Sequence, residues 1–510
     1  MQKLPVILLT LMAIGCSSKK EYPLVKSSLE KFYDADLAPF YHGVASGDPL
    51  QNAVVIWTKI TPTDSVPSIT GEWEVASRDD FTGILLNGKF QTSPEKDFTV
   101  KVDVKGLDAG TTYFYRFKVG ETYSAVGRTK TTPISADSLK FAVVSCSNYE
   151  QGFFNAYARI AERTDIDAVI HLGDYIYEYQ AGKYGDSTTG RFHEPPHEIV
   201  KLYDYRTRYA QYRLDKDLRT AHQNHPFITI WDDHEIANNS YQSGAQNHQP
   251  EEGDYGKRKS AARQAYYEWL PVRESPKLYR SVSYGNLAEL IMLDERIEGR
   301  TAPVDSVDHP AIGDTTRHML GVSQMNWLKD KLSQSTSQWK IIGNQVIFSY
   351  LNWGYAPNFT INMDSWDGYP AERSQIIQHI KNENLENIVF ITGDTHSSWA
   401  LEVTEDPFGD YQENGAVAVE FGTASINSAN SNERFPTDTV KIHEKRIVGA
   451  PLNPQLKYTN LRDHGYLELT LLPEEVQARY YYVDKINEPS SVETLAKTLR
   501  AAAGENVIRE

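Results

Sequence analysis

The spacing of hydrophobic and polar positions divides the chain into two parts with different periodicity. Residues 38–131 contain short apolar or alternating segments separated by turn residues at regular intervals, which is typical of an antiparallel, Ig-like β-sandwich. In the second half of the segment Thr112–Val119 apolar and charged residues alternate, so we expect Tyr113, Tyr115, Phe117 and Val119 to face the core. The other strands expected in this part cover residues 53–58, 71–75 and 98–104. A linker is expected within residues 129–138.

From residue 139 onward, apolar strands alternate with segments of helical spacing. This order predicts a layered α/β domain over residues 139–485. The expected strands cover residues 141–145, 168–172, 225–230, 288–293, 339–343, 387–391, 417–421, 465–470 and 476–483. The expected helices cover residues 153–163, 198–212, 257–269, 323–332 and 371–383. For the tail, residues 486–510, we expect a closing helix at 493–502.

The first residues predict export. A short basic start is followed by an apolar run, Leu4–Gly15, which has the length of a signal-peptide core and is too short to span a bilayer. The small residues before Cys16 resemble a bacterial lipobox, so we expect lipidation of Cys16 and anchoring to a membrane, periplasmic or at the cell surface. The alternative is an ordinary signal peptide that is cleaved nearby. In the lipoprotein interpretation, residues 1–16 are the signal peptide with its lipobox, and residues 17–37 are a polar tether.

Charge and cysteine content narrow the possible partners. The 510-residue chain has a formal net charge of −16, which argues against nucleic acid as a partner because no large basic face is available. The chain contains only two cysteines. If Cys16 carries lipid, Cys146 lacks a disulfide partner, and a lone thiol in an exported protein needs burial or a role as a ligand.

Four of the predicted strands end in residues that can bind metal ions. These endings are Ser145-Cys-Ser-Asn148, Gly173-Asp-Tyr-Ile-Tyr177, Trp231-Asp-Asp-His-Glu235 and Gly393-Asp-Thr-His396. Parallel strands place their carboxyl ends at one edge of the sheet, so we expect these side chains to meet in one crevice. Burying so many carboxylates without cations would be costly, which indicates a metal cluster. For the last ending alone, the alternative is a turn in which Asp394 caps a helix and His396 packs in the core.

The motifs that contain these endings resemble a known family. Gly173-Asp174-x-x-Tyr177, Trp231-Asp-Asp-His-Glu235 and Thr392-Gly-Asp-Thr-His-Ser-Ser-Trp399 are similar to the metal-binding blocks of PhoD-type alkaline phosphatases. These enzymes belong to the calcineurin-like metallophosphoesterases and are related to purple acid phosphatases. The resemblance runs from about residue 41 to 483. It includes three further blocks, Tyr205-Arg-Thr-Arg-Tyr-Ala210, Leu293-Asp-Glu-Arg296 and Leu320-Gly-x-x-Gln-x-x-Trp-Leu328.

The resemblance implies roles for individual residues. Asp174 would bridge two metals, and Tyr177 and Cys146 would bind Fe(III). Three more ligands would complete the iron and Ca²⁺ shells: Asp233, Asp394 and His396. Many relatives outside this branch carry Asp at the position of Cys146, Gly-Asn-His-Glu at the third block and a compact Gly-His-x-His ending. The oxygen-rich ligands in this sequence instead favour calcium beside the iron. Tyr177 also alternates with Tyr175 and Tyr179, any of which could belong to the core.

The expected chemistry is hydrolysis by a metal-activated water. Cations neutralise the phosphate and lower the pKa of bound water to about 7. His234 could protonate the leaving group or bind the phosphate, or it could be a buried histidine bonded to a carboxylate. Arg296 and Arg208 are candidates to hold the phosphate through two hydrogen bonds, although arginine more often packs on the surface or forms ion pairs.

The leading hypothesis is an exported, monomeric phosphatase that releases inorganic phosphate from small organic monoesters. A phosphodiesterase on the same scaffold, acting on nucleotide, phospholipid or polymer diesters, is the nearest alternative. A third possibility is a non-catalytic surface lipoprotein that uses calcium for binding, but such a protein would not need Cys146 or Tyr177.

Overall fold

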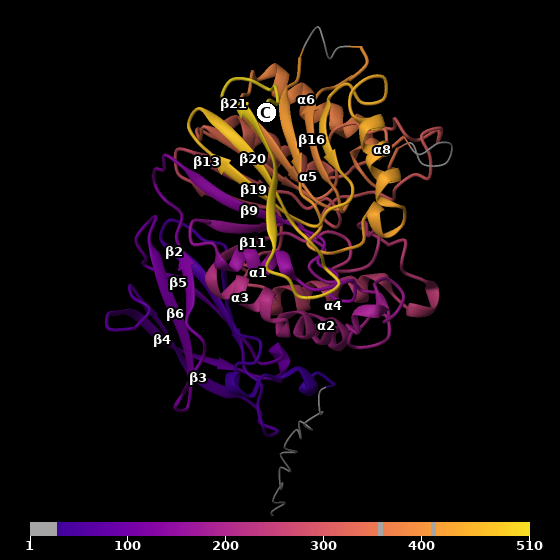
Figure 1. The fold of residues 1–510 in the computed structure, drawn as a ribbon. Coiled ribbons are helices and arrows are strands. Elements are labelled where there is room, and N and C mark those ends of the chain that lie inside the picture. Colours follow the sequence, from indigo (N-terminus) through magenta and orange to yellow (C-terminus); the bar gives the residue numbers. More distant parts are fainter. Residues whose placement is uncertain (1–27, 355–360, 410–414) are drawn as a thin grey trace, which may run out of the picture.

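The computed structural model describes residues 28–354, 361–409 and 415–510 (Figure 1). The expected signal peptide with Cys16, and residues 17–27 of the expected tether, lie outside these ranges. Within the described ranges, we find no helix with the length and apolar character needed to cross a membrane.

Two large sheets form the centre of the α/β part. The first has nine strands in the order β21-β20-β19-β9-β10-β11-β1-β2-β5. Its bounds are β1 Val44–Gly47, β2 Ala53–Lys59, β5 Thr99–Lys105, β9 Leu139–Val144, β10 Ala168–His171, β11 Pro226–Thr229, β19 Gly465–Leu471, β20 Glu475–Val483 and β21 Glu493–Ala502. The second has seven strands in the order β12-β13-β14-β15-β17-β16-β18. Its bounds are β12 Arg280–Tyr284, β13 Ala288–Met292, β14 Trp339–Asn344, β15 Ile388–Thr392, β16 Ser398–Val403, β17 Ala418–Gly422 and β18 Leu456–Asn460.

The parallel centres of both sheets bring the candidate residues together. Strands β9, β10 and β11 run parallel, and so do β13, β14, β15 and β17. One hydrophobic cluster joins the two sheets and includes Phe141 and Val169 from the first and Ile341 and Ile391 from the second. Beyond the strands, Ser145 pairs with Ser425 in a parallel bridge. The loops after β9, β10, β11 and β15 therefore meet at one edge of the sandwich, as expected for carboxyl ends of parallel strands.

Helices cover the sheets on their outer faces. The helices α1 (Asn155–Glu162), α2 (Leu202–Leu214), α3 (Lys216–Asn224) and α4 (Tyr255–Trp269) contribute to the cluster of the nine-stranded sheet (Figure 1). The helices α5 (Gly321–Gln334) and α6 (Pro370–Asn382) bury apolar residues with the seven-stranded sheet. A further helix, α8 (Thr437–Ile447), packs beside β16 and β18. The predicted α/β alternation is therefore confirmed.

The N-terminal β part shares a layer with the α/β part. A separate sheet contains β3 (Ile69–Ala76), β4 (Ile84–Thr92), β6 (Thr112–Val119) and β7 (Thr122–Tyr123), with β8 (Gly127–Lys130) pairing to β6. It packs on β2 and β5, and Tyr113, Tyr115 and Phe117 are buried between the layers as predicted. Because β1 pairs in parallel with β11, the second layer of this sandwich continues directly into the nine-stranded sheet.

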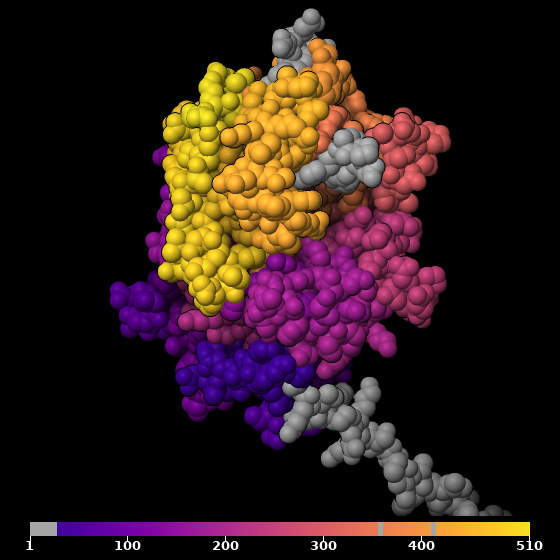
Figure 2. Space-filling model, turned by 45° about the vertical axis from the view of Figure 1, so that its right-hand side comes forward, coloured from indigo at the N-terminus to yellow at the C-terminus, as the bar shows by residue number. Residues whose placement is uncertain are grey.

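The expectation of a C-terminal helix is wrong. Residues 493–502, predicted to be helical, form β21, which pairs antiparallel with β20 and contributes to the band of C-terminal residues in Figure 2. The residues favour a helix by local propensity, but the open edge of β20 offers backbone hydrogen bonds that outweigh this preference. The end of the expected tether is also packed: Leu29 is 2% exposed in the main core, and Tyr33 stacks on Tyr41 at 4.2 Å between ring centroids.

Candidate active site

Sharp backbone turns position the side chains at the strand ends. Cys146 follows β9, Asp174 follows β10, and Asp394 and His396 follow β15; their φ angles are 59°, 55°, 63° and 57°. Residues with a side chain rarely adopt this left-handed conformation, and such residues concentrate at functional sites. Gly173 has a φ of +107°, and a Cβ there would lie 2.3 Å from the backbone nitrogen of Asp232. The loops after β10 and β11 therefore approach each other so closely that no residue with a side chain fits at position 173.

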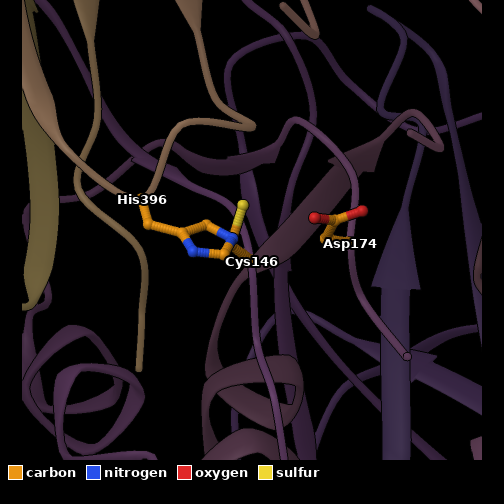
Figure 3. A group of neighbouring side chains, drawn as sticks. All are labelled: Cys146, Asp174 and His396. Carbon is orange, nitrogen blue, oxygen red and sulfur yellow. The ribbon is translucent and has the colours of Figure 1, made fainter. Parts of the chain in front are cut away.

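The first group of donors contains Cys146, Asp174 and His396, whose ligand atoms all lie within 4.8 Å of one another (Figure 3). The hydroxyl of Tyr177 joins them: it donates to Asp174 Oδ2 at 3.1 Å and lies 3.2 Å from His396 Nε2. His396 Nδ1 donates to the carbonyl of Ala429 at 2.7 Å. Because a carbonyl can only accept, the proton is on Nδ1, and the lone pair of Nε2 faces the other donors.

The second group contains Asp174, Asp233 and His234, again within 4.8 Å. Asp174 belongs to both groups and therefore occupies the position between them. Its Oδ1 accepts from the backbone nitrogen of His234 at 3.4 Å, and Asp233 Oδ2 accepts from the backbone nitrogen of Asn239 at 2.6 Å. Asp394 belongs to neither group among the described residues, but Arg296 Nη2 donates to its Oδ1 at 3.2 Å.

The electrostatics of the site favour bound cations. Burial, with the charges of Asp233 and Asp232, raises the pKa of Asp174 well above its usual value, although His234 opposes this. Burial and the neighbouring Asp174 also raise the pKa values of Cys146 and Tyr177, and burial lowers the pKa of His396 to about 4. All these groups are held in their neutral forms by the protein alone, and a cation reverses this preference. A thiol, a phenol, an imidazole and a shared carboxylate form a donor set that fits a transition metal.

Arg296, considered as a residue that binds phosphate, has protein carboxylates as partners in the structure. Its guanidinium is fully buried and donates to Asp232 Oδ1 at 2.5 Å, to Asp364 Oδ2 at 2.5 Å and to Asp394 Oδ1. Every nitrogen is used, so Arg296 orients carboxylates around the site. Sequence reasoning did not assign a role to Asp232 or Asp364. The adjacent pair Asp232-Asp233 was the available signal for the first, whereas no local motif marks the second.

Arg208, the other candidate to hold phosphate, is also occupied. It is fully buried and donates to the backbone carbonyls of Tyr177, Tyr179, Glu194 and Pro195. Its four partners all lie in the loop region that follows β10. Arg208 therefore holds the segment that carries Tyr177.

His234 forms a pair with a glutamate that sequence reasoning did not single out. Its Nδ1 lies 2.6 Å from Glu178 Oε2, and Glu178 Oε1 accepts from the backbone nitrogen of Asn238 and from Asn247 Nδ2. Burial lowers the pKa of His234. The carboxylates of Asp233, Glu178 and Asp174 raise it by a larger amount, so the pKa of His234 lies well above its usual value. The only signal in the sequence was the position of Glu178 directly after Tyr177.

Comparisons with known proteins identify the family of the chain. The family model described as PhoD-like phosphatase matches residues 141–480, and that of the PhoD-like phosphatase N-terminal domain matches residues 27–133. The chain is 36% identical over 482 residues to alkaline phosphatase D of Bacillus subtilis (strain 168), covering 89% of this chain and 79% of that protein. A solved structure of PhoD superposes with a TM-score of 0.82 at 33% identity, covering 93% of this chain and 92% of the other.

These matches extend over nearly the whole chain and confirm the resemblance inferred from the motifs. They also confirm the fold class, a β-sandwich part followed by a layered α/β part. The chain therefore belongs to the PhoD-like phosphatase family and is a hydrolase of phosphate esters.

Proposed function

We propose that this protein is a metal-dependent phosphatase that hydrolyses small organic phosphate monoesters. The observation that carries the proposal is the convergence of Cys146, Asp174, Tyr177 and His396, with Asp233 joined to them through Asp174. A non-catalytic calcium-binding surface would not need a buried thiol and phenol at this point. The PhoD family supports metal dependence in general, and the donor set supports the identity of the metals.

The donors divide by chemical character. Cys146, Tyr177 and His396, together with Asp174, would hold Fe(III), because thiolate, phenolate and imidazole suit a transition metal. Asp174, Asp233 and Asp394 would contribute oxygen ligands to Ca²⁺. When bound, the cations neutralise the phosphate and activate the attacking water. Arg296 keeps the carboxylates of Asp232 and Asp394 in place. Donors and dipoles that are fixed in a buried site stabilise the charge that develops in the transition state.

The residues of the chain also provide a route for a proton. Glu178 accepts the Nδ1 hydrogen of His234 and thereby orients the ring, so that Nε2 faces the side of Asp233, with 3.9 Å between Nε2 and Asp233 Oδ1. A protonated His234 donates from Nε2 to the leaving alkoxide as the bond to phosphorus breaks. Glu178, which is not among the proposed metal ligands, favours this protonated form.

Elemental analysis and turnover measurements on the purified protein test the proposal. We expect iron and calcium in the protein, a visible absorption band from the Fe(III)–phenolate bond, and faster hydrolysis of p-nitrophenyl phosphate than of bis(p-nitrophenyl) phosphate. Tyr177→Phe should remove the band, whereas Tyr179→Phe, the matched control in the same segment, should retain it. A strong preference for the diester would favour the phosphodiesterase alternative. A colourless and fully active protein would contradict the iron assignment.

We also propose export and anchoring through lipid on Cys16, in a monomeric protein. The support is the apolar run before Cys16 in the sequence. Labelling of the expressed protein with a fatty-acid analogue tests the anchor: Cys16→Ser should abolish the label and release the protein from membranes. Labelling that persists in this variant would contradict the proposal. Analytical ultracentrifugation tests the oligomeric state.

A further inference from the structure

A pocket of about 400 Å³ lies directly beside the candidate metal centre and shares His396 with it. Three aromatic side chains contribute to its walls: Tyr184, Trp353 and Phe435. The remaining lining comes mostly from the segment that follows Ser428, including Asn430 and Arg434. This segment also carries the carbonyl of Ala429 that orients His396, so the same segment lines the pocket and positions a candidate metal ligand.

Arg434 differs from the two arginines that sequence reasoning selected. It is exposed, and within the described parts of the chain its guanidinium has no hydrogen bond or ion pair. Arg296 and Arg208, in contrast, are buried and use their nitrogens on protein oxygens. Burial raises the pKa of Tyr184, and the positive charge of Arg434 partly opposes this rise, which is consistent with its place at the pocket. An unpaired cation beside an acidic metal site is available to an anionic ligand.

Asn430 provides a second, independent indication of a ligand. The residue is 5% exposed, and its Oδ1 accepts from the backbone nitrogen of Asn432 at 3.0 Å. Its amide Nδ2 is buried and lacks an acceptor among the described residues. A buried donor without a partner is costly, so an acceptor supplied by a ligand would relieve this cost.

The two donors are held in place by their own segment. The backbone nitrogen of Asn430 donates to Glu433 Oε2 at 2.9 Å, which closes the short helix η7 (Ser431–Glu433) that leads to Arg434. Glu433 Oε1 in turn lies 3.0 Å from His464 Nε2. Ser431 N donates to the carbonyl of Leu461 at 3.1 Å. The donors of Asn430 and Arg434 are therefore carried on a segment that is anchored at both ends, as a binding site requires.

We propose that this pocket binds the leaving group of the substrate, and that Asn430 and Arg434 recognise a second anionic group on it. The inference rests on the proposed function, because the scissile phosphate must occupy the metal centre. The aromatic walls accept a ring, and the guanidinium and the amide donate to carboxylate or phosphate oxygens. The preferred substrates are thus phosphate monoesters whose leaving group carries both a ring and a further negative charge.

Two substrates of nearly the same shape test the inference: 4-carboxyphenyl phosphate, whose leaving group is anionic, and 4-carbamoylphenyl phosphate, whose leaving group is neutral. We expect Arg434→Gln to lower the ratio of their kcat/KM values by about tenfold, since hydrogen bonds to charged groups contribute about this much. Arg78→Gln, which removes another exposed arginine, shortly after β3, is the matched control and should leave the ratio unchanged.

Asn430→Asp is the second variant. It keeps the oxygen that accepts from Asn432 but replaces the unpartnered donor with a negative charge, so it should lower the same ratio without unfolding the segment. If both variants leave the ratio unchanged, the inference is overturned. Equal losses on both substrates also overturn it, because Arg434 would then act on the scissile phosphate. If the metal-loaded wild-type protein hydrolyses neither substrate, the proposed function itself fails, and that result is distinct from the other two.

Discussion

The pair formed by Glu178 and His234 leads to the most specific prediction about catalysis. Glu178→Gln keeps the shape of the side chain, and its remaining oxygen can still accept from the backbone of Asn238 and from Asn247. The new amide group, however, cannot accept the Nδ1 hydrogen of His234, which now lies 2.6 Å from a carboxylate oxygen. The protonated ring therefore loses its main stabilising partner and its orientation.

The expected size of the effect follows from this contact. A buried hydrogen bond between charged groups contributes about 1.5–3 kcal/mol, which corresponds to a decrease in kcat of about 10- to 100-fold. KM should change little, because the carboxylate of Glu178 is fully buried. The decrease should be larger for phenyl phosphate than for p-nitrophenyl phosphate, since the poorer leaving group depends more on protonation.

The measurement is steady-state kinetics on a series of aryl phosphates with increasing leaving-group pKa. The matched control is Glu372→Gln, because Glu372 is another buried carboxylate that contacts a histidine, with 3.2 Å between Oε1 and His318 Nδ1. That variant should lose stability without changing the dependence on the leaving group. The reasoning would be refuted if Glu178→Gln lowered kcat equally across the series, or left it unchanged.

Three further predictions concern the framework of the site and its cations. Arg208→Gln should lower the free energy of unfolding by about 3 kcal/mol, because several buried carbonyls lose a charged donor; urea unfolding measures this, and a raised KM with unchanged stability would contradict it. Gly173→Ala should abolish metal binding and turnover, since its Cβ would lie 2.3 Å from Asp232 N, whereas Gly182→Ala, with no atom within 4 Å, should retain both. Dialysis against a strong chelator should abolish turnover, and added iron and calcium should restore it; full activity in the metal-free protein would count against metal catalysis.

Much of the fold follows from the sequence because its signals are local. The strands β9, β10, β11 and β15 are short apolar runs, and the helices between them have regular apolar spacing, so both could be predicted without tertiary information. The candidate donors could also be located, since Cys146, Asp174, Asp233 and His396 each follow a strand, and parallel strands bring their ends together. Periodicity and chain order were sufficient for these features.

Other features depended on partners that are distant in the sequence. Residues 493–502 have the composition of a helix, yet they form a strand because β20 leaves an edge to pair with. The strands β1, β2 and β5 join the sheet of the α/β part through the pairing of β1 with β11, about 180 residues away. Local propensity does not encode these choices, because the hydrogen bonds that decide them come from other segments.

The arginines show most clearly which features the local sequence indicates and which depend on distant partners. In the sequence, Arg208 and Arg296 were reasonable candidates to hold a phosphate because each lies in a family-like motif, whereas Arg434 lies in none. The tertiary structure surrounds the first two with buried carbonyls and carboxylates and leaves the guanidinium of Arg434 unpaired, among the described residues, at the pocket. The sequence by itself therefore determined which chemical groups gather at the edge of the sheets. Only the packing of distant segments decided which charges are already neutralised by the protein and which are available to a substrate, because that depends on every neighbour in space.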